Sequence, residues 1–225
     1  MYDFKNILYN IIILYVIASF YEWYIHKYIM HGDPKFLKRI PIIGEILRIT
    51  AESHHHHHKQ VLMNMHYIDE HSTNGFEWFE SAVMFILILV TFKMLTTIKS
   101  NYVILAVSIT IVLIYCFLWN TIHNKMHYTT KTMSFNQGVP SIILDPSIIQ
   151  NPIYKFLYIN HGIHHLQKGQ KYNYNIIFPI FDYIFFTKKY GKCYNNVAYC
   201  KFNESKDKRC ATKKIGCINT DLDEN

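Results

Sequence analysis

The chain has 225 residues, of which half are apolar, 16% are aromatic and only 17% are charged. This length and composition fit one folded domain with a small appendage and exclude a disordered protein, because the chain can bury much of its surface. The formal net charge is +7 at pH 7, and the 14 histidines are an unusually large number for one domain. Imidazole is the commonest metal ligand, so the histidines direct attention to metal binding.

Three apolar blocks predict membrane-spanning helices over about residues 6–22, 81–98 and 102–119. The third block has 18 consecutive residues without a charge. A helix needs about 20 apolar residues to cross a bilayer core of ~30 Å, and the second block qualifies because the amine of Lys93 can reach the boundary. The alternative is a soluble helical bundle, whose helices carry a polar stripe at the helical period. Residues 102–119 have no such stripe, so the sequence favours a membrane protein.

Basic residues lie between the first and second blocks and after the third, whereas the connection between the second and third has only Lys99. The positive-inside rule therefore predicts that both large polar regions, which hold every histidine, face the cytosol. We expect an all-α, multi-pass integral membrane protein with a cytosolic, histidine-rich helical cap that binds two metal ions. Residues 1–188 form the predicted membrane domain.

The remaining apolar stretches are interrupted by proline. Residues 142–157 and 174–186 are predicted to form helices that lie at the membrane surface. Residues 189–225 form a predicted cytosolic tail rich in cysteine and lysine. Its cysteines have no CxxC spacing, which favours free thiols over a zinc or disulfide lobe; they are Cys193, Cys200, Cys210 and Cys217.

Ten histidines form four motifs that flank the second and third apolar blocks. Positions i, i+3 and i+4 share one helix face, so each H-x2-HH motif is predicted to aim three imidazoles at one point. The H-x4-H pair lies about 140° apart on an ideal helix, so it must converge from a helix end or reach two different ions. Ten imidazoles exceed what one ion can hold, which predicts two metal ions. The motifs are H-x4-H (His26, His31), H-x2-HH (His54, His57, His58), H-x3-H (His123, His127) and H-x2-HH (His161, His164, His165).

Other residues near these motifs are expected to play supporting roles. Glu22 and Glu52 are predicted to orient histidine rings rather than to bind metal. His55 and His56 are predicted to point away from the shared face of their helix. An all-histidine site suits iron, zinc, copper or nickel and leaves the metal cationic, which favours O2 activation.

Four sequence segments carry a resemblance to a known family. EWYIHKYIMHG, ESHHHHHKQVLMNM, WNTIHNKMHY and HGIHHLQKGQKYNYNIIFPIFDYIFFT resemble the histidine boxes of the fatty acid hydroxylase/sterol desaturase superfamily, and most of all its fatty acid 2-hydroxylase branch. The resemblance covers about residues 5–188. It also points to Asn120, Tyr174 and Asn175 as residues beside the metal or the substrate.

The resemblance implies an oxidoreductase of the endoplasmic reticulum membrane in which the ten histidines bind two iron ions. Such an enzyme uses O2 and two electrons to remove a hydrogen atom from a lipid acyl chain and form an alcohol, here on a fatty acid or sphingolipid at C2. The chain has no His-Pro-Gly-Gly haem box, so we expect no haem and an external electron donor such as cytochrome b5 and its reductase. Lipid and membrane are the expected partners, and nucleic acid is not.

Several alternatives stay open at this point. A second hydrogen abstraction would make the protein a sterol or lipid desaturase, and a carotenoid-type hydroxylase has the same chemistry. A catalytically inactive membrane scaffold that holds metal, with zinc in place of iron, is the alternative from a different class of function.

Overall fold

The computed structural model describes residues 4–61, 65, 75–129, 131–165 and 169–189. Within these ranges the regular elements are all helices, apart from an isolated β-bridge between Glu77 and Gly138. The all-α prediction is therefore confirmed for this part of the chain. The elements are α1 (Phe4–Tyr24), η1 (Ile25–Met30), α2 (Pro34–Leu37), α3 (Gly44–Gln60), α4 (Trp78–Leu95), α5 (Asn101–Met126), η2 (Pro146–Gln150), α6 (Pro152–His165), η3 (Gly169–Lys171) and α7 (Ile180–Ile184).

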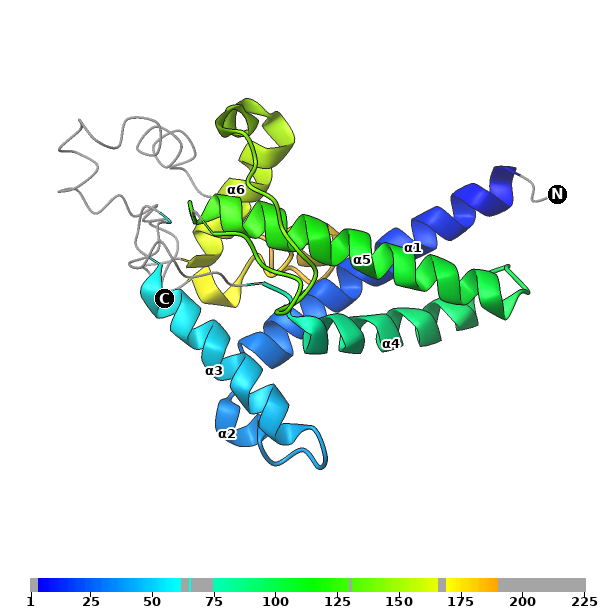
Figure 1. Ribbon diagram of the computed structural model, residues 1–225, viewed down its shortest axis with the longest axis horizontal. Coiled ribbons are helices and arrows are strands. Elements are labelled where there is room, and N and C mark those ends of the chain that lie inside the picture. The colour runs from blue at the N-terminus through cyan, green and yellow to red at the C-terminus, as the bar shows by residue number, and fades with distance from the viewer. Residues whose placement is uncertain (1–3, 62–64, 66–74, 130, 166–168, 190–225) are drawn as a thin grey trace.

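Three helices are long and apolar enough to cross a membrane, as the sequence predicts: α1 with its continuation η1, then α4, and α5. At 1.5 Å per residue, even α4 is about 27 Å long. Helices α4 and α5 form a hairpin beside α1, and the N-terminal end of α1 lies at the same end of the molecule as the hairpin connection (Figure 1). His26 lies just after the C-terminal end of α1, and His123 lies near the C-terminal end of α5, so both are far from the hairpin connection. The histidine-bearing segments therefore gather at one end of the three spans.

The predicted bounds of the second and third spans differ from the structure, in which α4 begins at Trp78 rather than at residue 81. Helix α4 ends at Leu95 rather than at residue 98, because Thr96 is extended and its hydroxyl donates to Asn10 Oδ1 on α1 at 2.6 Å. Asn10 Nδ2 in turn donates to Thr97 Oγ1 at 3.1 Å, so polar side chains fix the hairpin connection against α1. Helix α5 continues to Met126 and thereby carries His123.

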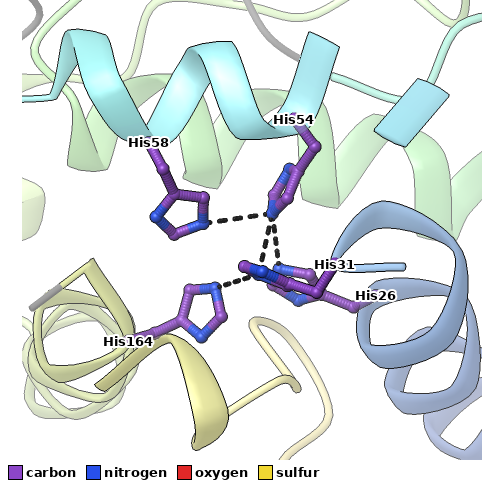
Figure 2. Close-up of side chains that lie close together, drawn as sticks. All are labelled: His26, His31, His54, His58 and His164. Atoms are coloured by element: carbon purple, nitrogen blue, oxygen red, sulfur yellow. Dashed lines mark hydrogen bonds between the residues drawn. The ribbon is translucent and has the colours of Figure 1, made fainter. Parts of the chain in front are cut away.

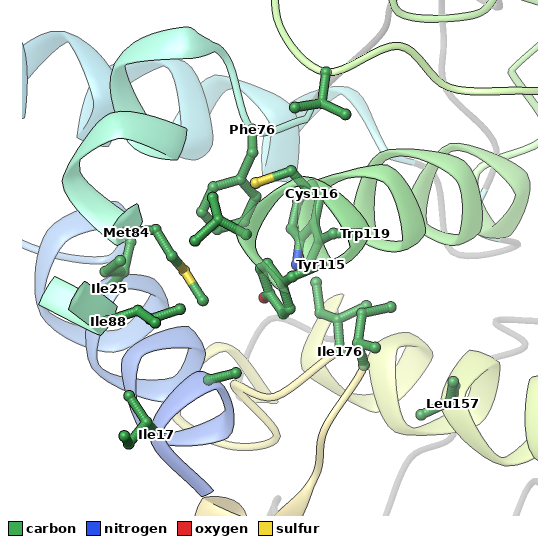
Figure 3. Packing of buried hydrophobic residues seen from close by; sticks show 14 of the residues in the cluster. Ile17, Ile25, Phe76, Met84, Ile88, Tyr115, Cys116, Trp119, Leu157 and Ile176 are labelled. Atoms are coloured by element: carbon green, nitrogen blue, oxygen red, sulfur yellow. The ribbon is translucent and has the colours of Figure 1, made fainter. Parts of the chain in front are cut away.

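The core lies between the spanning helices (Figure 3). Met84, Ile88 and Phe92 follow one another at four-residue intervals, so they form the buried stripe of α4. The opposite face of this helix is also apolar, because Ile86 and Val90 are more than half exposed. Only 22% to 33% of the most apolar window of each spanning helix is buried inside the molecule. Apolar surface on all sides is typical of a helix in contact with lipid.

The two proline-interrupted stretches do not each form one surface helix, contrary to the prediction. Within residues 174–186 only Ile180–Ile184 is helical, and residues 174–177 are buried. Residues 142–157 do not form one surface helix: they include the short η2, and a new helix, α6, begins at Pro152, a residue that suits the first turn of a helix. Helix α6 carries Leu157 and Tyr158 in the core, so it belongs to the interior of the protein. The four tail cysteines lie outside the described residues.

Candidate metal centre

All ten predicted histidines come together, in two groups of five. Within each group the candidate ligand nitrogens lie within 4.8 Å of one another. The first histidine group is His26, His31, His54, His58 and His164, and the second histidine group is His57, His123, His127, His161 and His165. The two groups adjoin, because the ring of His58 stacks on that of His165 with centroids 4.2 Å apart.

A π-helical turn explains how His26 and His31 reach the same group. Helix α1 passes into the π-helix η1, and the backbone N–H of His31 donates to the carbonyl of His26 at 3.0 Å, five residues back. Because a π turn closes on residue i+5 instead of i+4, residues five apart face the same way. The rings stack with centroids 5.1 Å apart. Of the two arrangements open from sequence, the structure therefore has both rings at one site.

The two H-x2-HH motifs are divided between the groups, which corrects the prediction that each aims three rings at one point. On an α-helix the i and i+4 side chains lie about 40° apart, and the i+3 side chain lies about 60° to the other side. On α3 the i, i+4 pair His54 and His58 belongs to the first group, and His57 belongs to the second. Helix α6 does the reverse, with His161 and His165 in the second group and His164 in the first.

The imidazole Nε2 atoms of the first group face one another (Figure 2). His54 Nε2 lies 3.1 Å from the Nε2 atoms of His26, His31 and His58. His31 Nε2 lies 2.9 Å from His164 Nε2. Three separate segments thus direct ring nitrogens at one small volume.

Backbone carbonyls determine which nitrogen of several rings carries the proton. His26 Nδ1 lies 2.5 Å from the carbonyl oxygen of Tyr174, and His164 Nδ1 lies 2.7 Å from that of Tyr172. A carbonyl only accepts, so each Nδ1 is the donor and the Nε2 lone pair of the neutral ring points at the other histidines. Several lone pairs directed at one point repel one another unless a cation lies between them, as in metal sites whose histidines donate their second N–H outward.

The second group has the same architecture. His161 Nε2 lies 2.9 Å from His127 Nε2 and 3.0 Å from His165 Nε2. His127 Nδ1 lies 2.9 Å from the carbonyl of Met65, which again leaves the Nε2 lone pair for the centre. His123 stacks on the buried ring of Trp119, with centroids 4.1 Å apart, so packing holds its orientation.

Burial keeps the imidazoles neutral. The pKa of His164 is lowered to about 4 by the loss of solvent around the ring. Burial, and then neighbouring imidazoles, lower the pKa of His54 and His161 well below the ordinary value. Neutral rings with inward lone pairs are the protonation state that metal binding requires. Nitrogen donors alone suit iron, zinc, copper or nickel, so the residues present fit two such ions.

Neither Glu22 nor Glu52 contacts a histidine ring directly, contrary to the prediction. Glu22 is buried, but its carboxylate accepts hydrogen bonds from residues 175–178 and not from an imidazole. Glu52 is exposed and pairs with Arg48 on the same face of α3. Glu52 lies on the outward face of α3 because it precedes His54 by two residues, a spacing that reverses the helix face.

His55 and His56, the other two histidines of α3, lie outside both histidine groups, as the helical period predicts. His56 is exposed, and His55 is half-buried with its ring 6.3 Å from that of His31. His66 and His71 lie outside the described residues.

Of the other predicted neighbours, Tyr174 supplies both a carbonyl and a ring beside the first group, whereas Asn120 has a structural role. Asn120 is fully buried and its side chain accepts from the Phe76 backbone N–H at 2.7 Å and donates to the Val139 carbonyl at 2.8 Å. The carbonyl of Met65 is a site atom that sequence reasoning missed, because a backbone group carries no signal in the residue type.

No family model, curated protein or solved structure matches this chain. The geometry of the histidine groups and the helices that hold them therefore carry the functional conclusion.

Proposed function

We propose that the protein is a membrane-bound, di-iron, O2-dependent oxygenase that hydroxylates a lipid acyl chain, at C2 of a fatty acid or sphingolipid. The observation that carries the proposal is the pair of adjoining all-histidine groups at one end of three lipid-compatible helices. Two iron ions, when bound there, would supply O2 activation and hydrogen abstraction from a C–H bond. The resemblance of the histidine motifs to the fatty acid hydroxylases supports the choice of iron and of an acyl substrate.

The residues of the chain have defined parts in this proposal. The five imidazoles of each group would hold one ion, and the carbonyls of Tyr172, Tyr174 and Met65 hold three of these rings with the Nε2 atom inward. Because every ligand in the two groups is a neutral imidazole, each bound ion would keep its full positive charge. The adjoining groups bring both ions to one substrate.

The position of the centre supports a substrate taken from the bilayer. The spanning helices end at the histidine groups, so an acyl chain in the membrane lies near the centre without leaving apolar surroundings. The basic residues are concentrated in the polar regions at this end, which favours a cytosolic orientation by the positive-inside rule. The endoplasmic reticulum is the compartment that the family resemblance implies. A basic surface also suits an acidic external electron donor of the cytochrome b5 type.

Lipid mass spectrometry tests this proposal. Membranes of cells that express the intact chain with a b5-type donor are compared with membranes of cells that express His164→Ala, and His56→Ala serves as the matched control on an exposed histidine. We expect an added oxygen on acyl chains or ceramides with the intact chain and with His56→Ala, and none with His164→Ala. Loss of two hydrogens from an acyl chain or sterol would instead identify a desaturase. Iron-loaded protein without any lipid product would refute the proposal in favour of an inactive scaffold.

A further inference from the structure

The segment of residues 172–178 lies against the first histidine group and presents its carbonyls to two of the five rings. The carbonyl of Tyr174 accepts from His26 Nδ1, and that of Tyr172 accepts from His164 Nδ1. The ring of Tyr174 also lies beside both, with centroids 5.8 Å from His26 and 5.7 Å from His164. The position of this segment therefore decides the orientation of two ligands that come from different helices.

Glu22 holds one end of this segment. Its Oε1 accepts from the backbone N–H groups of Ile176 and Ile177 at 2.6 and 2.8 Å. Its Oε2 accepts from the backbone N–H of Phe178 and from Asn175 Nδ2, both at 3.1 Å. The carboxylate is 1% exposed, so these four donors replace the water that a charged group would otherwise need.

Asp182 holds the other end. Its Oδ1 accepts from the Tyr174 backbone N–H at 2.8 Å, and its Oδ2 accepts from the Asn175 backbone N–H at the same distance. The hydroxyl of Thr187 donates to Oδ1 at 2.8 Å. Asp182 is fully buried as well. Two buried carboxylates, from α1 and α7, thus accept every backbone N–H from residue 174 to residue 178.

We propose that Glu22 and Asp182 are positioning residues for the metal ion of the first histidine group, which they influence through residues 172–178. The inference rests on metal binding in the proposed function. It adds the residues that hold two rings of the first histidine group in a fixed orientation. The carbonyl that orients His127 in the second group belongs to Met65, outside this segment. Changes to either carboxylate will therefore weaken the first site far more than the second.

The experiment uses two backgrounds of the full-length protein in detergent. His127→Ala with His161→Ala disables the second group and leaves the first. His54→Ala with His58→Ala disables the first group and leaves the second, without touching a ring that residues 172–178 orient. The affinity for Zn2+ is measured in each background by competition with a chromophoric chelator, so no enzyme activity is needed.

Glu22→Gln preserves the size of the side chain but replaces one acceptor oxygen with an NH2 group that faces N–H donors. We expect this variant to weaken Zn2+ binding at the first group roughly 10- to 100-fold, the usual effect of removing a group that orients a ligand. In the background that keeps only the second group, we expect less than about a twofold change in Zn2+ affinity, because the carbonyl that orients His127 there belongs to Met65. Asp182→Asn is expected to give the same selective loss, so the proposal does not depend on one variant folding.

Asn10→Ala is the matched control, because Asn10 is a buried polar residue on the same helix as Glu22, with hydrogen bonds at the far end of the spans. It is expected to lower the thermal midpoint without changing Zn2+ affinity in either background. Equal weakening of both groups by Glu22→Gln and Asp182→Asn, or no weakening of the first, would overturn the inference. Absence of Zn2+ binding in both backgrounds before any further change would overturn the metal centre itself, a result distinct from the others.

Discussion

Acidification of the metal-free protein is expected to unfold it, because the histidine groups must fold in the neutral state. A histidine whose pKa is lowered on folding contributes its full stability above its unfolded pKa and loses that stability as the pH falls, since the unfolded state then binds more protons. For His164 the pKa falls from 6.5 to about 4 on folding. The loss therefore develops between about pH 6.5 and pH 4.

The magnitude follows from the size of the shift. A lowering of this size corresponds to about 3 kcal/mol of unfolding free energy by pH 4 for His164 alone. Burial lowers the pKa of further histidines in the same direction, so the total loss is larger. Typical domains are stable by about 5–15 kcal/mol. The metal-free fold is therefore expected to fail well above pH 4.

The measurement is the thermal unfolding of chelator-treated, full-length protein in one detergent, from pH 8 to pH 4. We expect the midpoint to be constant above about pH 7 and to fall steeply below pH 6.5. His164→Gln removes one titrating group and is expected to lose about 3 kcal/mol less over this range, whereas the exposed-site variant His56→Gln is expected to follow the unaltered chain. A midpoint that does not change between pH 7 and pH 4 would refute the reasoning, as would an identical loss in His164→Gln.

Three further predictions concern single side chains. Asn120→Ala should lower the free energy of unfolding by about 3 kcal/mol, because it removes the hydrogen-bond partner of the buried Phe76 N–H and Val139 carbonyl. Denaturant titration measures this loss, and a loss below about 0.5 kcal/mol would contradict it. Gly75→Ala should cost about 1–3 kcal/mol in the same assay, because the added methyl group would overlap the Asn120 amide. His57→Ala should weaken Zn2+ binding only at the second group, and His58→Ala only at the first, although the two are adjacent in sequence. Competition in backgrounds that keep one group would show both variants acting on the same site if this division is wrong.

The sequence was sufficient to predict the helical class and the three spans, because apolar blocks of bilayer length leave few other structures. It also identified the ten histidines, since eight of them have i, i+3 or i+4 spacings and the H-x4-H pair flanks the same pair of spans. The end of α4 could not be predicted from hydropathy, because it depends on a contact between Thr96 and Asn10, 86 residues apart.

The division of the histidines between the two groups depends on tertiary structure. The i, i+3, i+4 spacing places His54, His57 and His58 on one broad face, but only the approach of the α6 histidines to that face shows that it carries two histidine groups. The partner of Glu22 is also wrongly predicted from sequence, for a similar reason. Its proximity to His26 in sequence predicted a direct contact, whereas the carboxylate is occupied by backbone donors more than 150 residues away.

The π turn at η1 also determines how many residues can separate His26 and His31 while both rings face the same group. Compared with an α-helix, this turn holds one extra residue between His26 and His31. Deleting Tyr28 would give two histidines four apart, which an ordinary α-helix can present on one face. Because a π turn uses about one residue more than an α turn for the same rotation, the residues after the deletion would keep nearly the same direction relative to α1. The wide turn thus accommodates one extra residue without turning His31, or the helix α3 that follows, away from the histidine groups.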